Sequence, residues 1–160
     1  MNATLRTEFI PAPATRSRND LKTVLVLLSG HERLRSLLSA YLRASGYELL
    51  VCTSPESARR KFRDVQGAVD LLLTDVSADL STEAEVSIDL WMYSDGRLKV
   101  LYLSNRALND WSVFDTAMFL QLPPDSVRVL QKPFSVLDLL IHVNELIGLP
   151  EERMGRQASA

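Results

Sequence analysis

Three polar side chains of complementary chemistry follow three apolar segments of the chain. Asp75 ends the segment 69–75, Ser104 follows 98–103, and Lys132 follows 127–131. A carboxylate can accept a phosphoryl group, and a hydroxyl and an ammonium can bind the oxygens of that group. Taken singly, each side chain has an ordinary role as a helix cap or a solvated charge. The chemistry therefore depends on whether the fold brings the three together.

The hydrophobic pattern predicts such a fold, because short apolar segments alternate with segments of helical character. The apolar segments are 23–28, 47–52, 69–75, 98–103 and 127–131, and their β-branched, continuous runs are typical of strands buried on both faces. Helices are expected between Ser29 and Gly46, from 55, at 82–93, within 108–120 and from 136. Strands joined through helices run parallel. The sequence thus predicts a three-layer, doubly wound α/β sheet, in which function lies outside the carboxyl ends of the strands.

Several helix starts carry capping signals. Ser54 precedes Pro55, and Ser135 precedes the last apolar helix, so both are predicted N-caps. The pair Thr82 and Glu85 has the spacing of a capping box at the start of the helix over 82–93.

Composition excludes several classes of protein. The 160 residues include one cysteine and two histidines, which exclude an intrachain disulfide and a Cys₄ or Cys₂His₂ zinc site. Eighteen basic against 20 acidic residues leave no basic surplus for binding nucleic acid. No apolar run is long enough for a membrane span or a secretory signal, which favours a cytoplasmic protein. We expect a disordered, basic leader over 1–22, a domain over 23–148 with a net charge of −4, and a tail over 149–160.

The domain resembles the receiver domain of two-component response regulators, which is not an enzyme. The resemblance implies a flavodoxin-like sheet of five parallel strands in the order 2-1-3-4-5. It implies that Asp75 is the phospho-acceptor, Ser104 the switch hydroxyl, and Lys132 the lysine before a cis proline, Pro133. It also implies a histidine kinase or phosphotransfer protein as phosphoryl donor, and a downstream protein partner. The face formed by the fourth helix, fifth strand and fifth helix is then a candidate homodimer interface. The segments that carry it are TVLVLLSGHERLRSLLSAYLRASGYELLVCTSPESA, VDLLLTDV, VLYLSN and VLQKPFSVLDLLIHVNELI.

The metal-binding part of the receiver pattern is altered. Receivers place acidic Mg²⁺ ligands directly after the first strand, and those positions are Ser29, Gly30 and His31 here. Mg²⁺ prefers hard oxygen ligands in octahedral geometry. With only Asp75 and the backbone of Ser77 remaining, the resemblance implies weakened Mg²⁺ binding and no other cofactor.

Ser29 also has the spacing of a capping box with Glu32, which would turn the metal pocket into a helix cap. In the alternative, His31 ligates a softer metal beside Glu32 and Asp75.

Other departures lie farther along the chain. Asp79 and Glu83 replace a usual proline and glycine, and Val129 replaces a common aromatic residue. The stretch from Ser104 to Lys132 is about six residues longer than usual. Two functions stay open: a receiver phosphorylated on Asp75, or a pseudo-receiver that serves as an interaction or dimerisation module without phosphorylation. A dinucleotide-binding enzyme is disfavoured, because Gly-x-Gly-x-x-Gly is absent.

Overall fold

The computed structural model describes residues 21–76 and 81–150. Its strands are β1 (Thr23–Leu27), β2 (Glu48–Cys52), β3 (Leu71–Val76), β4 (Lys99–Ser104) and β5 (Val127–Gln131). Its helices are α2 (Glu32–Ala44), α3 (Pro55–Asp64), α4 (Ser81–Tyr93), the short 3₁₀ helix η2 (Leu108–Asp110), α5 (Val113–Phe119) and α6 (Val136–Ile147). The predicted leader over 1–22 and tail over 149–160 lie almost wholly outside the described residues.

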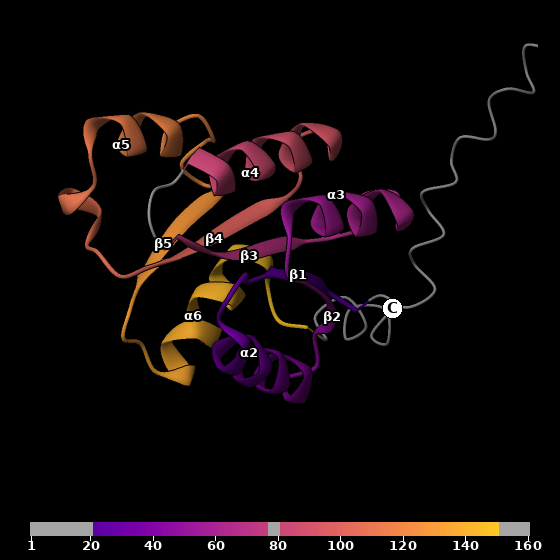
Figure 1. The fold of residues 1–160 in the computed structure, drawn as a ribbon. Helices are drawn as coiled ribbons and strands as arrows, with labels where there is room; N and C mark the ends of the chain where they lie inside the picture. Colours follow the sequence, from indigo (N-terminus) through magenta and orange to yellow (C-terminus); the bar gives the residue numbers. More distant parts are fainter. Residues whose placement is uncertain (1–20, 77–80, 151–160) are drawn as a thin grey trace, which may run out of the picture.

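The strands form one parallel sheet in the order β2-β1-β3-β4-β5, which confirms the predicted fold. Helices α2 and α6 cover one face, and α3, α4 and α5 cover the other (Figure 1). Alternate residues of β1 enter two separate cores, with Leu25 and Leu27 on the α3 and α4 side and Val24 and Val26 on the α2 and α6 side. Because both faces are buried, the central strands β1, β3 and β4 are mostly apolar.

Two of the predicted helix caps are confirmed. The Ser54 hydroxyl accepts a hydrogen bond from the amide of Ser57, and Pro55 is the first residue of α3. Ser135 and Asp138 form a reciprocal capping box at the start of α6.

The other two predicted capping boxes are wrong. Helix α4 begins at Ser81, so Thr82 already lies inside it. Helix α2 begins at Glu32 with His31 as the N-cap residue and no side-chain cap. Gly30 adopts a φ of 75°, which interrupts the helical path and delays the helix by two residues. The Ser29 hydroxyl instead donates a hydrogen bond to the carbonyl of Thr53 at 2.7 Å.

The predicted helix within 108–120 is divided in two. Trp111 and Ser112 take extended backbone angles between η2 and α5, and the Ser112 hydroxyl caps α5 by accepting from the amide of Asp115. This break turns the Trp111 side chain back toward the sheet. In the described parts of the chain, no helix combines the length and the apolar character that a bilayer crossing needs.

Candidate functional site

An ion pair joins the ends of β3 and β5 across the end of β4. Nζ of Lys132 lies 2.5 Å from Oδ1 of Asp75, and the side chains are 19% and 3% exposed. The backbone amide of Lys132 extends the ladder by donating to the carbonyl of Ser104 at 2.7 Å. The peptide bond between Lys132 and Pro133 is cis. Parallel strands end at the same edge of a sheet, so the carboxylate and ammonium that the sequence analysis singled out meet there.

His31 contacts the other oxygen of the same carboxylate. Its Nε2 lies 3.3 Å from Oδ2 of Asp75, and the imidazole is 44% exposed. The carboxylate of Asp75 is thus held between a nitrogen that precedes α2 and one that follows β5. In the resemblance to receivers, His31 occupies the position of an acidic metal ligand, and the structure puts a nitrogen donor there.

The hydroxyl of Ser104 is occupied on the other side of this edge. It donates to the carbonyl of Arg106 at 2.8 Å, and it accepts from the amide of Arg106 at 3.0 Å and from Nε1 of Trp111 at 3.3 Å. A hydroxyl has one proton to donate and two lone pairs, so this one is saturated. Ser104 therefore stands at the predicted place in the sheet, but its hydroxyl bonds to the loop beyond β4 rather than to Asp75 or Lys132.

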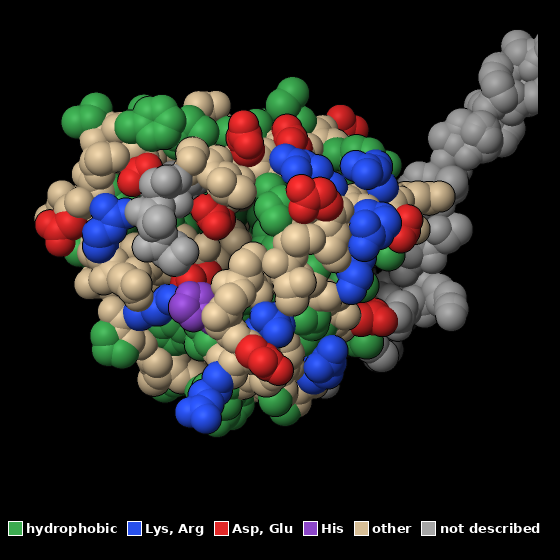
Figure 2. All heavy atoms as spheres, viewed as in Figure 1, with side chains coloured by type: hydrophobic (Ala, Val, Ile, Leu, Met, Phe, Trp, Pro, Cys, Tyr) green, Lys and Arg blue, Asp and Glu red, His purple; other side chains and the backbone are tan. Residues whose placement is uncertain are grey.

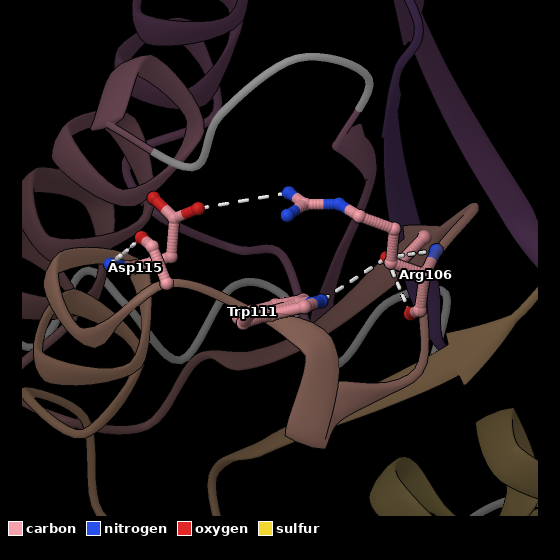
Figure 3. A network of polar contacts seen from close by, with 5 residues as sticks. Arg106, Trp111 and Asp115 are labelled. Carbon is pink, nitrogen blue, oxygen red and sulfur yellow. Dashed lines mark hydrogen bonds and ion pairs between the residues drawn. The ribbon is translucent and has the colours of Figure 1, made fainter.

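The loop that binds Ser104 is itself held by charge. The guanidinium of Arg106 lies 3.6 Å from Oδ2 of Asp115, whose side chain is 6% exposed. Figure 3 shows the Trp111 indole pointing toward the start of this loop, while Arg106 reaches across to Asp115 at the start of α5. Sequence reasoning missed the roles of Arg106, Trp111 and Asp115 at this edge of the sheet. Their roles depend on the break between η2 and α5, which the hydrophobic period does not reveal.

Aromatic rings seal this side of the site. Trp111 packs edge-to-face on Phe119 at 5.7 Å, and Phe119 packs on Tyr102 at 6.2 Å between ring centroids. Burial raises the pKa of Tyr102 to about 12.

Elsewhere in the core, burial raises the pKa of the Cys52 thiol to about 11, against the lowering effect of Lys61. Cys52 is therefore protonated at neutral pH and unsuited to nucleophilic chemistry.

The described residues do not fit a Mg²⁺ ion in the receiver manner. The Ser29 hydroxyl is bonded to Thr53, Gly30 has no side chain, and His31 offers a nitrogen. Within 21–76 and 81–150, no three His, Cys, Asp or Glu side chains form a metal-binding group. The backbone of Ser77, the other predicted ligand, lies outside the described residues. Mg²⁺ requires several hard oxygen ligands, and the described residues of this edge supply too few of them.

A small cavity of about 100 Å³ opens on the α4 side of Asp75. Thr82 and Glu83, in the first turn of α4, line it together with Ser29 and Thr74. Glu83 is thus a second carboxylate that borders the same space as Asp75.

Comparison with known proteins bears on the fold. No protein-family model and no curated protein matches the sequence. Among solved structures, the chemotaxis protein CheY4 of Vibrio cholerae matches with 19% identity over 78% of this chain and 98% of its own, at a TM-score of 0.63. A CheY-like response regulator receiver domain of Methanospirillum hungatei matches with 20% identity over 79% and 94%, also at 0.63. The chain has the receiver fold.

A further solved structure that is similar to this chain has a name of another kind. A putative pilus assembly-related protein of Burkholderia pseudomallei has 20% identity over 79% of this chain and 91% of its own, at a TM-score of 0.57. At such identities the shared property is the fold, and function must be argued from the site. On the receiver fold, Asp75, Ser104 and Lys132 lie at or directly beside the carboxyl ends of the third, fourth and fifth strands.

Proposed function

We propose that the chain is a response-regulator receiver domain that accepts a phosphoryl group on Asp75. The observation that carries this proposal is the ion pair between Asp75 and Lys132 at the carboxyl edge of a receiver fold. The donor is a histidine kinase or a phosphotransfer protein of the cytoplasm. The chain acts as a phosphoryl acceptor rather than as an enzyme, and it transmits the signal through protein contacts.

The proposed step uses groups already in contact. An oxygen of Asp75 attacks the phosphorus of a phosphohistidine, the phosphorus–nitrogen bond breaks, and the donor imidazole leaves with a proton from solvent. The product is an acyl phosphate on Asp75. The ammonium of Lys132 stays beside the carboxyl group and binds an oxygen of the transferred group, since charge-assisted contacts to phosphate are strong.

The test is phosphorylation by acetyl phosphate, followed by the intact mass of the protein. We expect the mass of one phosphoryl group to be added, and the label to disappear in Asp75→Asn, which has nearly the same size but no nucleophile. Asp110→Asn, at an exposed acid of η2, is the matched control and should label normally. A chain that stays unlabelled with and without added Mg²⁺ would contradict the proposal.

A pseudo-receiver is the second candidate, because both oxygens of Asp75 already have nitrogen partners and the usual acidic positions hold Ser29 and Gly30. In that case the chain works as an interaction module whose output does not depend on phosphorylation. The discriminating measurement is partner binding by Asp75→Asn. An unchanged affinity, in a chain that takes no label, would favour the pseudo-receiver.

Either function needs a surface for partners, and we propose the face of α5, β5 and α6. Hydrophobic side chains gather over α5 (Figure 2). Val113 and Phe114 on α5 are 88% and 60% exposed, and Leu137 on α6 is 65% exposed. Exposed apolar clusters mark interaction sites. Phe114→Ser should therefore weaken self-association, measured as molar mass by light scattering across a concentration series. A mass equal to one chain at all concentrations would argue against a homodimer.

A further inference from the structure

We propose that His31 takes the place of a divalent cation at this site, so that the phosphoryl group on Asp75 is bound by His31 and Lys132 without Mg²⁺. The inference rests on the proposed function of Asp75 as the acceptor. It adds a metal-independent binding mode and assigns His31 a role that the receiver pattern does not provide.

The two nitrogens flank the carboxylate. Nζ of Lys132 lies 2.5 Å from Oδ1 of Asp75, and Nε2 of His31 lies 3.3 Å from Oδ2. A phosphoryl group carried by either oxygen therefore begins with a nitrogen donor beside it. Neutral imidazole carries one N–H, so His31 can donate to a phosphate oxygen at neutral pH. Hydrogen-bond donors held in place stabilise the charge of an oxyanion, as a metal ion does at other sites.

The position of His31 is fixed by the turn that carries it. Before the turn, the guanidinium of Arg35 donates to the carbonyl of Leu28 at 2.9 Å. The Ser29 hydroxyl ties the turn to the carbonyl of Thr53 at 2.7 Å. After the turn, the carbonyl of His31 accepts from the amide of Arg35 at 2.9 Å, in the first turn of the 13-residue helix α2. The imidazole is thus anchored through its backbone.

His31 is also accessible. Its side chain is 44% exposed, whereas that of Asp75 is 3% exposed. An incoming phosphoryl donor must approach the buried carboxylate from solvent, and it meets the imidazole at the rim. Gly30, directly before it, has open space where a Cβ would be, since no atom lies within 4 Å. The turn that carries His31 is therefore open to solvent on this side.

The competing arrangement is a cation bound in the 100 Å³ cavity that Asp75 and Glu83 both line. In that arrangement Glu83, in the first turn of α4, supplies the second carboxylate and His31 is a bystander. The two arrangements predict opposite effects of metal and of substitutions at His31 and Glu83.

The experiment titrates the full chain with beryllofluoride, a mimic of the phosphoryl group, and follows the bound fluorine by ¹⁹F NMR. Titrations in EDTA and in excess Mg²⁺ are compared. We expect binding in EDTA, with a dissociation constant within about threefold of that in Mg²⁺. His31→Asn should weaken binding in EDTA by about tenfold, the loss of one charge-assisted hydrogen bond. Asparagine is a favoured N-cap residue, so α2 should still form.

Two controls complete the design. His142→Ala removes the other histidine of the chain, in α6, and should bind beryllofluoride as the parent does. Glu83→Gln should leave binding in EDTA unchanged.

Each contrary outcome has a distinct meaning. Binding that requires Mg²⁺ and is lost in Glu83→Gln would overturn the inference and leave Asp75 as the acceptor. Equal binding in EDTA by the parent and by His31→Asn would also overturn it. No binding under either condition would overturn both this inference and the proposed function.

Discussion

The ends of β3 and β4 are neighbours in the sheet, yet they hold their polar side chains in opposite ways. At the end of β3, Asp75 is charged and contacts side chains 44 and 57 positions away in the chain, one of them open to solvent. At the end of β4, the neutral Ser104 bonds within seven residues and is sealed by aromatic rings. The Asp75 side can therefore meet an incoming group directly. Ser104 can join it only by giving up a bond to Arg106 or Trp111.

The largest change in the free energy of unfolding is expected at the end of β3, where Asp75 and Lys132 form an ion pair. Lys132→Met should lower the free energy of unfolding by about 3 kcal/mol, because it leaves the carboxylate of Asp75 buried without its ammonium partner. The value lies at the low end for buried pairs because the Lys132 side chain is 19% exposed. Urea denaturation measures it. The double variant Asp75→Asn with Lys132→Met should recover most of the loss.

Lys99→Met is the matched control for this substitution. The Lys99 ammonium donates to the carbonyl of Asp125 at 3.3 Å in an exposed contact, so its change should be small. Equal losses in the free energy of unfolding for Lys132→Met and Lys99→Met would mean that the ion pair with Asp75 contributes no more than an exposed lysine contact.

The second largest change in the free energy of unfolding is expected at the end of β4, where aromatic rings cover Ser104. Trp111→Phe keeps an aromatic ring near Phe119 but removes the indole N–H that Ser104 accepts, and should cost about 1–2 kcal/mol in the free energy of unfolding. Ser104→Ala should cost less in the Trp111→Phe background than in the parent, and a double-mutant cycle measures this coupling. Strict additivity of the two losses would contradict the described bond.

Trp91→Phe serves as the comparison. The indole nitrogen of Trp91 is buried and has no hydrogen-bond partner among the described residues. Removing it gives up no bond, so Trp91→Phe should cost less than Trp111→Phe.

The free energy of unfolding at alkaline pH tests whether Tyr102 is buried. An unfolded tyrosine loses its proton near pH 10, whereas burial raises the pKa of Tyr102 to about 12. Between these values the unfolded state holds fewer protons than the folded state, so stability falls as pH rises. The share of Tyr102 is about 1 kcal/mol at pH 11. Urea denaturation at pH 9 and pH 11 measures it.

Tyr102→Phe isolates that share. Tyr47 and Cys52 also have pKa values raised by burial, to about 12 and about 11, so they lower stability in the same pH range in both proteins. The variant should show a flatter dependence of stability on pH. Identical dependences would mean that Tyr102 is open to water.

The smallest effect is expected at the ion pair of Arg106 and Asp115. The Arg106 side chain is 38% exposed and lies 3.6 Å from Asp115. Solvent screens such a pair, so Arg106→Gln should cost about 0.5 kcal/mol. The cost should shrink as salt is raised, which denaturation at low and high NaCl checks. A loss as large as that of Trp111→Phe would mean that charge, rather than the indole, holds the loop.

Sequence periodicity was enough for the sheet, because parallel strands buried on both faces need continuous apolar runs such as 23–28 and 69–75. Strand ends then indicated Asp75 and Lys132 as residues of one edge. Two local conformations escaped the pattern. The φ of Gly30 moved the start of α2 and presented His31 to Asp75. The extended residues between η2 and α5 turned Trp111 toward Ser104. Both depend on backbone angles, which hydrophobic spacing does not encode.

The hydroxyl of Tyr47 fastens the end of α6 to the beginning of β2, by a hydrogen bond of 2.5 Å to the Asn144 side chain and a contact of 3.1 Å to the carbonyl of Gly148. The first strand starts beside it, since Thr23 pairs with Glu48. The described fold thus begins and ends at the amino edge of the sheet. That edge lies about 17 Å, the length of one strand, from Asp75. A reporter joined directly at Leu21 or Pro150 would therefore lie at the edge of the sheet opposite Asp75, so protein immobilised at these points is a fair substrate for the acetyl phosphate assay.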